Sequence, residues 1–272
     1  MRSIVRWAGS KRQILKKLRP HWSDAYRRYI EPFAGSACLF FDLQPRRAIL
    51  ADLNSELIRT YQALTNDVDQ VIRHFSLMSS DSNTYYKVRA VNPDALSLPE
   101  LAARFLYLNR NCFNGLYRTN MAGGFNVPYG PPKSAVLNFE QDVRSAAEML
   151  RTAELEVADF EDTVSKARSG DFVYLDPPYM IQKRRVFREY LPRSFSASDL
   201  GRLGKCLQRI DENGAAFLIS YADSPEARAL LRPWRYQRVR VRRHISGFVD
   251  TRRVGFELLA YNRLLEDISD GN

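Results

Sequence analysis

Short apolar segments that end at an acidic residue are the feature of this sequence that most restricts its fold. Three of them precede an aspartate: residues 47–51 before Asp52, 155–158 before Asp159, and 172–175 before Asp176. Helical patterns separate these segments, and strands that alternate with helices form mostly parallel sheets with helices on both faces. We therefore predict an α/β fold. The other segments with a strand pattern are residues 28–30, 215–220, 236–241 and 256–261.

The alternation is interrupted between residues 65 and 135. Helical patterns around residues 68–78 and 98–109 lead into an aromatic, turn-rich segment that contains Gly123-Gly124. This composition is typical of a β-hairpin-like excursion with the glycines at its tip. We predict one domain formed by residues 1–64 and 136–272, into which residues 65–135 are inserted as a helical and β-hairpin domain.

The chain is strongly basic. Its 272 residues include 41 Lys and Arg against 31 Asp and Glu, which gives a formal net charge of +10. The hydrophobic fraction of 45% is that of an ordinary globular protein, so extensive disorder is not expected. The excess positive charge indicates an anionic partner, and nucleic acid is the commonest large one.

The cysteines and histidines do not suggest a metal site. Cys38, Cys112 and Cys206 lie far apart in the sequence, as do the three histidines, and we interpret all six as structural. The first residues lack the apolar core of a secretory signal, and no apolar run reaches membrane-spanning length. We expect a cytoplasmic protein, and a monomer, because neither a long heptad pattern nor an obvious apolar patch is present.

The segment Asp176-Pro177-Pro178-Tyr179 carries the strongest functional signal. Two prolines cannot continue a β ladder, so the preceding strand ends abruptly, and open α/β sheets bind ligands at the carboxyl ends of their strands. Asp176 offers a carboxylate, Pro177 a free carbonyl and Tyr179 an aromatic face. These groups suit a planar ligand with an exocyclic amine, such as a flipped nucleobase. The alternative is a strand that simply stops at a proline turn.

Glu31 and the aspartates that follow the strands are expected along one edge of the sheet. Asp52, after the second strand, suits a pair of ribose hydroxyls, and Gly35 lets the backbone approach a ligand closely. The three-glycine dinucleotide signature and the lysine of a phosphate loop are both missing, so NAD and ATP are poor candidates. Taken singly, each acid is more often a helix cap or a solvated loop residue.

Six motifs occur in an order that is found in a known family. They are Trp7-Ala8-Gly9-Ser10-Lys11, Glu31-Pro32-Phe33-Ala34-Gly35, Ala51-Asp52-Leu53-Asn54, Asn109-Arg110-Asn111-Cys112-Phe113-Asn114-Gly115, Gly124-Phe125-Asn126-Val127-Pro128 and Asp176-Pro177-Pro178-Tyr179. From about Arg6 to Asn262 the chain resembles the Dam-like family of DNA adenine-N6 methyltransferases. Each motif alone is of middling specificity, whereas all six in order are very specific.

The resemblance implies S-adenosylmethionine as the cofactor and a seven-stranded Rossmann-like methyltransferase sheet with a reversed final hairpin. Residues 1–64 and 136–272 would then bind the cofactor and catalyse the reaction, and residues 65–135 would recognise the DNA target. The implied cofactor contacts are Trp7 and Lys11 near the methionine end, Glu31, Phe33 and Gly35 in the surrounding turn, Asp52 at the ribose, Asp159 and Phe160 at the adenine, and Asp176 beside the target.

The resemblance also gives the catalytic segment its chemistry. Adenine N6 is a poor nucleophile because its lone pair is delocalised into the ring. Asp176 and the Pro177 carbonyl would accept its two hydrogens, which favours a tetrahedral nitrogen whose lone pair faces the methyl group. Tyr179 would stack on the extruded base. Catalysis would rest on positioning and electrostatic preorganisation, with direct methyl transfer and no covalent enzyme intermediate.

The insertion would supply the contacts with double-stranded DNA. Phe113 would wedge into the stack vacated by the flipped adenine, with Asn114 beside it. Arg118 is the candidate for reading a guanine in the major groove, and Leu116 for an apolar base contact. The alternative is a hairpin whose Phe113 packs on its own domain and whose Arg118 is solvated.

Phosphate contacts are expected from Asn120 and Asn126. Further backbone contacts are available to groups of basic residues, which are equally typical of solvated faces. These groups are residues 183–185, 188, 193 and 238–243.

Two departures from the family pattern concern the cofactor turn and the recognition site. Ala37 stands where a second glycine is usual, which bears on the affinity for the cofactor. Leu116 and Arg118 favour a GATC-like site, whereas Pro131 and Pro132 stand where basic and aromatic residues are common.

Two alternatives stay open. An enzyme acting on cytosine N4 or another amino group often carries Ser or Asn where Asp176 stands, so the aspartate argues against it. A relative that binds DNA without turnover is opposed by the intact catalytic segment together with Lys11 and Asp52. C5-cytosine chemistry needs a thiolate nucleophile, and none of the three cysteines follows a proline in a loop after a strand.

Overall fold

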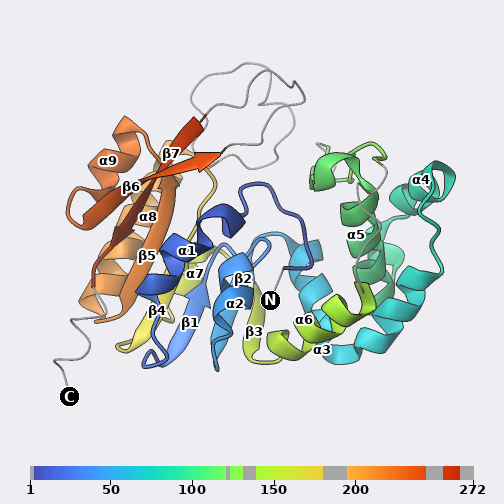
Figure 1. Ribbon diagram of the computed structural model, residues 1–272, viewed down its shortest axis with the longest axis horizontal. Coiled ribbons are helices and arrows are strands. Elements are labelled where there is room, and N and C mark those ends of the chain that lie inside the picture. Colours follow the sequence, from blue (N-terminus) through green and yellow to red (C-terminus); the bar gives the residue numbers. More distant parts are fainter. Residues whose placement is uncertain (1–2, 121–122, 131–138, 180–194, 243–253, 264–272) are drawn as a thin grey trace.

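Figure 1 shows the computed structural model, which describes residues 3–120, 123–130, 139–179, 195–242 and 254–263. Its centre is a seven-stranded sheet with the strand order β3-β2-β1-β4-β5-β7-β6. Strands β1 to β5 pair in parallel, and β7 is antiparallel to both of its neighbours. The α/β sheet with a reversed final hairpin is therefore confirmed. The strands are β1 (Arg28–Glu31), β2 (Ala48–Asp52), β3 (Ala153–Val157), β4 (Asp171–Leu175), β5 (Ala216–Ala222), β6 (Arg235–Arg242) and β7 (Val254–Tyr261).

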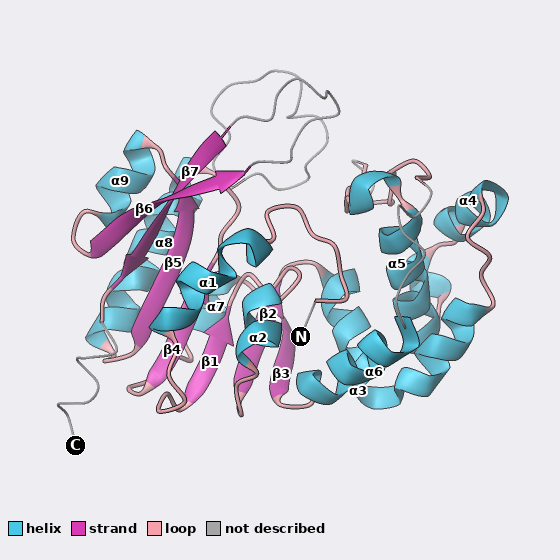
Figure 2. Cartoon of the chain, in the orientation of Figure 1, coloured by secondary structure: helices cyan, strands magenta, loops and turns pink. Residues whose placement is uncertain are grey.

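Helices cover both faces of the sheet (Figure 2). Helices α1, α2, α3, α5 and α6 contribute to one apolar core, and α7, α8 and α9 to the other. The helices are α1 (Leu15–Leu18), α2 (Cys38–Leu43), α3 (Ser55–Ser76), α4 (Ser82–Ala90), α5 (Leu98–Asn111), α6 (Phe139–Leu150), α7 (Phe160–Val164), α8 (Ala197–Glu212) and α9 (Pro225–Leu231). Short 3₁₀ turns are η1 (Lys11–Ile14), η2 (Arg19–His21), η3 (Pro93–Ala95) and η4 (Phe113–Gly115).

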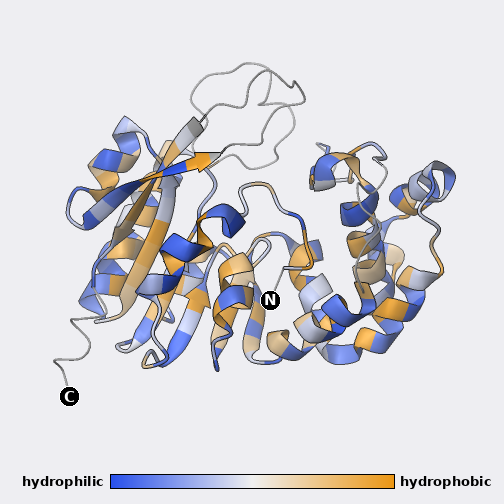
Figure 3. Cartoon of the chain, in the orientation of Figure 1, coloured by the Kyte–Doolittle hydropathy of each residue, from blue (hydrophilic) through white to orange (hydrophobic). Residues whose placement is uncertain are grey.

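The central strand β4 shows why the sheet is buried on both sides. Phe172 and Tyr174 belong to the core under α2 and α3, while Val173 and Leu175 belong to the core under α7 and α8. A parallel strand between two helical layers buries both of its faces, and all of β4 is buried. The one acid of the strand, Asp171 at its start, is paired with Arg28 at 2.6 Å. In Figure 3 the neighbouring strand β5 is coloured largely as hydrophobic.

The lobe beside the sheet, at the right of Figure 1, is formed mainly by α3, α4, α5 and α6. Helix α3 runs through the expected boundary at residue 64 and is kinked at Asp67, whose φ of −154° and ψ of 77° are not helical. Helix α4 was not predicted; it begins after Asp81, whose side chain accepts a hydrogen bond from the Thr84 amide. The division into two domains stays a prediction.

The hairpin-like excursion expected after α5 is present in the described residues. Antiparallel bridges join Cys112 to Tyr129 and Thr119 to Phe125, and the Asn126 amide donates to the Arg118 carbonyl at 3.0 Å. Near its tip Gly123 has a φ of +82°, a conformation that favours glycine. Its base packs on a small core of its own, which contains Tyr85, Tyr107, Leu108, Cys112, Phe125 and Val127.

The edge strand β6 is basic on one side. Val239 and Val241 are buried, whereas Arg238 and Arg240, which alternate with them, are exposed. Arg238 binds Asp223 at 2.6 Å and lies over the Phe256 ring, so this arginine is engaged within the fold. Charged side chains on an edge strand hinder pairing with other chains. The basic residues 183–185, 188, 193 and 243 lie outside the described residues.

Candidate active site

Four acids lie at the carboxyl edge of the parallel strands, as expected from their positions in the sequence. Glu31 and Asp52 are the last residues of β1 and β2, Asp159 follows β3, and Asp176 follows β4 directly. These four strands are neighbours in the sheet, so the acids lie along one continuous edge.

The turn between β1 and α2 is tied to Asp52. One carboxylate oxygen of Asp52 accepts from the Gly35 amide and the other from the Asn54 amide, both at 2.9 Å. The Tyr61 hydroxyl donates to the Gly35 carbonyl at 2.8 Å. Burial raises the pKa of Asp52, an effect that the amide hydrogen bonds oppose. Asp52, which was predicted to bind the ribose, thus also holds the turn that contains Gly35.

Glycine is required at residue 35 for two reasons. Its φ is +45°, and a Cβ atom there would lie 2.8 Å from Cδ1 of Trp7. Trp7 in turn stacks on Tyr117 with ring centroids 5.3 Å apart. Ala37 also has a positive φ, +46°, which explains physically why a glycine suits that position.

Glu31 is buried at the end of β1. The Tyr29 hydroxyl donates to its carboxylate at 2.9 Å. Burial raises its pKa well above the usual range, the Tyr29 hydrogen bond opposes that rise, and the nearby Asp176 and Asp52 add to it. This edge of the sheet therefore gathers acids whose ionised forms are disfavoured by burial, and for Glu31 also by the neighbouring acids.

Phe33 and Phe160, which were expected at the same ligand, lie against each other. Their rings stack with centroids 5.2 Å apart, and the guanidinium of Arg202 lies 4.6 Å from the centre of the Phe160 ring. Phe195 contacts both rings edge-on or tilted. An aromatic cluster beside Asp159 is thus built from the turn after β1, the first residue of α7 and the segment just before α8.

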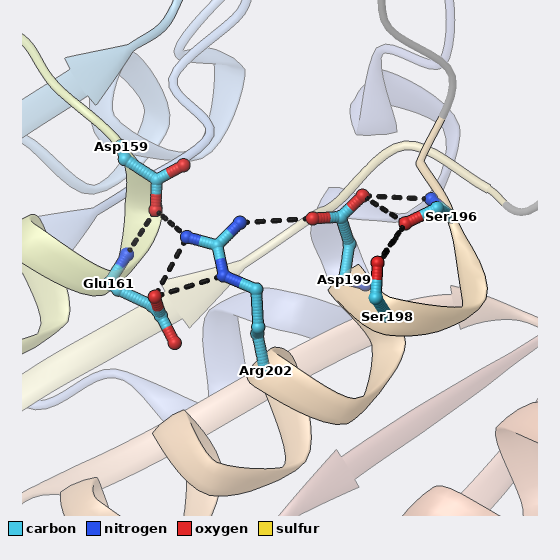
Figure 4. A network of polar contacts seen from close by, with 6 residues as sticks. All are labelled: Asp159, Glu161, Ser196, Ser198, Asp199 and Arg202. Atoms are coloured by element: carbon cyan, nitrogen blue, oxygen red, sulfur yellow. Dashed lines mark hydrogen bonds and ion pairs between the residues drawn. The ribbon is translucent and has the colours of Figure 1, made fainter.

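Asp159 is held by Arg202 in the network of Figure 4. One carboxylate oxygen, Oδ1, accepts from the Glu161 amide at 3.0 Å and from Arg202 Nη2 at 2.6 Å. Arg202 also binds Glu161 at 2.8 Å and Asp199 at 2.9 Å. Asp199 forms a capping box with Ser196 at the start of α8. The other oxygen of Asp159 has no hydrogen bond to a described residue.

Asp176 is bound to Lys11. The ammonium Nζ lies 2.7 Å from Oδ1 of Asp176, and it also donates to the Gly9 carbonyl at 3.0 Å. Ser220, from the neighbouring strand β5, donates to the same oxygen at 3.1 Å, and the hydroxyls of Ser220 and Tyr174 are 2.9 Å apart. Burial raises the pKa of Asp176, while Lys11 acts in the opposite direction. The contacts from Lys11 and Ser220 both go to Oδ1 of Asp176, and Oδ2 has no partner among the described residues.

Tyr179 is tied into the same cluster through its hydroxyl. This oxygen accepts from Lys11 Nζ at 2.9 Å and donates to Oε1 of Glu257 at 2.6 Å. Glu257 lies on β7, and its Oε1 is 3.7 Å from Lys11 Nζ. Burial alone lowers the pKa of Lys11, but Asp176, Tyr179 and Glu257 together raise it, so the lysine is charged at every physiological pH.

Three residues of this site were not found from the sequence: Ser220, Glu257 and Arg202. Glu257 carried a readable signal, because it is a single acid in the apolar run 256–260 of an expected strand. Arg202 lies three residues after Asp199 on α8, so its contact with Asp199 joins residues that are close in the sequence. Its contacts with Asp159 and Glu161 join residues that are far apart in the sequence. Ser220 had no signal beyond its place at the end of a strand.

The expected DNA-contacting residues lie in and after η4. Phe113 is 46% exposed and Leu116 is 37% exposed, which is unusual for large apolar side chains and suits contact with a partner. Asn114 has a positive φ of 56°. Arg118 donates to the Asn126 side chain at 2.8 Å, so these two candidates form a pair within the excursion.

Asn120 stabilises the tip of the same excursion. Its side chain accepts from the Gly124 amide at 2.9 Å, and its carbonyl accepts from the Gly123 amide at 3.0 Å. The phosphate contact expected of Asn120 stays a prediction.

The thiols do not offer a nucleophile. Burial raises the pKa of Cys38 and of Cys112 to about 11, and that of Cys206 to about 12. A thiol with such a pKa is protonated at neutral pH and is a poor nucleophile. The described ranges contain no group of His, Cys, Asp and Glu that could hold a metal ion, and no helix there is both long and apolar enough to cross a membrane.

Comparison with known proteins supports the same family over nearly the whole chain. A family model described as D12 class N6 adenine-specific DNA methyltransferase matches residues 7–245. The chain is 34% identical to a DNA adenine methylase of Serratia marcescens, over 96% of this chain and 98% of that protein. It is 33% identical to the type II methyltransferase M1.LlaDCHI of Lactococcus lactis subsp. cremoris, over 89% of both.

A third relative, the type II methyltransferase M.MjaIII of Methanocaldococcus jannaschii, is 32% identical over 96% of this chain and 99% of its own length. These matches confirm the resemblance drawn from the six motifs, and they favour adenine N6 over the cytosine N4 alternative. The chain belongs to the D12 class of N6 adenine-specific DNA methyltransferases.

Proposed function

We propose that this protein transfers the methyl group of S-adenosylmethionine to N6 of an adenine that is flipped out of double-stranded DNA, with Asp176 as the residue that accepts the amino hydrogens. The observation that carries this proposal is the position of Asp176. It follows β4 directly, is anchored through one oxygen by Lys11 and Ser220, and keeps Oδ2 for the substrate.

The residues at the strand edge fit S-adenosylmethionine by their chemistry. The buried acids Glu31, Asp52 and Asp176 suit a ligand that carries a sulfonium and an ammonium group. The free oxygen of Asp159 suits an adenine amino group, with Phe33 and Phe160 beside it, and Trp7 borders the Gly35 turn. When bound, the cofactor would supply an electrophilic methyl group.

The protein's own part in the reaction is to orient the amino group. Asp176 Oδ2 and the Pro177 carbonyl would each accept one N6 hydrogen, which localises the lone pair on nitrogen. The two prolines fix the direction of that carbonyl, because neither residue has a free φ angle. Tyr179 would present its ring to the base while its hydroxyl stays bound to Lys11 and Glu257. These contacts cost no rearrangement at the moment of transfer.

A duplex without the target amino group tests the proposal. Labelled S-adenosylmethionine is incubated with a duplex that contains adenine, and with one in which purine lacking the 6-amino group replaces every adenine. We expect label in the first duplex alone. Label in both would show that the methyl group is transferred to another atom.

Replacing Arg202 by Met is expected to weaken S-adenosylmethionine binding about tenfold, because Asp159 loses a charge-assisted hydrogen bond and Phe160 loses its cation contact. Calorimetric titration measures the affinity. The exposed Arg209 on the same helix, also replaced by Met, is the control. Equal affinities of the two variants would show that Arg202 does not support the cofactor site.

Replacing Phe113 by Ala is expected to reduce base flipping about tenfold, because the wedge that fills the vacated stack is lost. The free energy of unfolding should change by only about 0.5 kcal/mol, since the side chain is half exposed. Fluorescence of 2-aminopurine at the target position reports flipping. The exposed Leu77, replaced by Ala, is the control. A normal fluorescence rise would contradict the wedge.

The recognition site is proposed to be GATC-like, read by Arg118 with Leu116 beside it. Reading a base would require Arg118 to exchange its contact with Asn126 for the guanine edge. Asn114, Asn120 and Asn126 would then position the duplex.

A further inference from the structure

Lys11 is shared between two acids that come from different parts of the sheet. Asp176 follows β4, and Glu257 lies on β7, two strands away in the order β4-β5-β7. Oxygens of the two carboxylates are 2.7 and 3.7 Å from the same ammonium nitrogen. The Tyr179 hydroxyl bridges Lys11 and Glu257 at 2.9 and 2.6 Å. All three charged side chains are largely shielded from water, with exposed fractions of 4% for Lys11, 19% for Asp176 and 8% for Glu257.

The cluster carries one more negative charge than positive charge. The three hydrogens of the ammonium are directed to Asp176, Tyr179 and the Gly9 carbonyl, so Glu257 is a second counter-ion that is close but not in direct contact. The second carboxylate oxygen of Glu257, Oε2, is buried and has no hydrogen-bond partner among the described residues. A buried acid with an unpartnered oxygen and no direct ion pair lowers the stability of the fold, so its presence needs an explanation.

The substrate supplies that explanation. An amino group is neutral, and a carboxylate held in a one-to-one ion pair is a weak acceptor for it. A second acid next to the lysine lowers the cost of loosening the first ion pair, because the ammonium keeps a counter-ion. A shift of about 1 Å would bring Nζ from its present position into direct contact with Glu257.

We propose that Glu257 is a positioning residue that shares the Lys11 ammonium with Asp176 and takes over as its counter-ion when the target amino group binds Asp176. This inference rests on the proposed function. Glu257 itself does not touch the base; it acts through Lys11 and through the hydroxyl of Tyr179. The other titratable groups around Asp176 are Glu31 on β1, Cys38 on α2 and Tyr174 on β4.

The substitution Glu257→Gln isolates the charge, because the amide oxygen can still accept from Tyr179. We expect the single-turnover rate on DNA to fall about tenfold at its plateau, with little change in S-adenosylmethionine affinity. The acidic limb of the pH–rate profile should move to lower pH, because the negative charge of Glu257 raises the pKa of Asp176 and the variant lacks it. A residue that only supports the fold would not produce this shift.

The matched control is Asp223→Asn. Asp223 is a similarly buried acid that follows β5 directly. Its amide donates to the carbonyl of Phe256 next to Glu257, and its side chain binds Arg228 and Arg238 rather than Lys11. Thermal unfolding of both variants is measured alongside the rates.

The inference is supported if Glu257→Gln alone shows both the lower plateau and the shifted limb. It is overturned if the wild type is active and Glu257→Gln has the same plateau rate and pH–rate profile. It is also overturned if the variant is slow and thermally unstable but the acidic limb of its pH–rate profile is unshifted. An inactive wild type would instead contradict the proposed function, and this inference with it.

Discussion

Asp176→Asn is expected to slow methyl transfer to DNA by about a hundredfold to a thousandfold while leaving S-adenosylmethionine bound. The amide has nearly the shape of the carboxylate, so the turn after β4 should survive. It lacks the negative charge that accepts the N6 hydrogens, and it cannot be the ion-pair partner of Lys11. Single-turnover kinetics measures the chemical step, and calorimetry measures cofactor binding.

The control for this substitution is Asp223→Asn, which removes a buried acid without touching the site. Wild-type rates in Asp176→Asn would show that another group accepts the amino hydrogens. A loss of cofactor binding equal to the loss of rate would place Asp176 at the cofactor rather than at the target.

Lys11→Met is expected to lower the free energy of unfolding by about 3–5 kcal/mol at neutral pH, because the buried Asp176 and Glu257 carboxylates lose their cation. The deficit should shrink as the pH falls. Without Lys11 the pKa of Asp176, already raised by burial, rises further. The folded variant then binds a proton more tightly than the unfolded chain, so acidification stabilises it relative to wild type.

Urea denaturation of both proteins at pH 8 and at pH 5 measures this deficit. The exposed Lys16, replaced by Met, is the control on the following helix α1. A deficit of the same size at both pH values would mean that Lys11 supports the fold through its packing and not through its charge.

Much of the fold could be predicted because the strands carry their own signals. Each of the seven expected strands is present, and β1, β2 and β4 lie within about one residue of the apolar runs that predicted them. Helix α4 was missed because it is short and only one of its residues, Tyr85, is buried, so its apolar pattern is weak. The boundary predicted at residues 64–65 falls inside α3, which continues to Ser76 through a kink at Asp67.

The candidate site could be predicted only as far as the residues adjacent to strand ends. Asp52, Asp159 and Asp176 were found because a parallel sheet brings such ends together. The partners that hold them, Arg202 and Glu257, could not be assigned from the sequence. Which side chain of α8 reaches Asp159, and which residue of the reversed strand β7 faces Tyr179, depends on the packing of α8 and on the register between β5 and β7.

The central claim is that the methyl group goes to adenine N6 at Asp176. Unmethylated DNA is incubated with labelled S-adenosylmethionine and with either the wild type or Asp176→Asn. The DNA is then digested to nucleosides, which are separated and identified by mass spectrometry. We expect labelled N6-methyldeoxyadenosine from the wild type and almost none from the variant. Label on cytosine, or equal label from both proteins, would contradict the account.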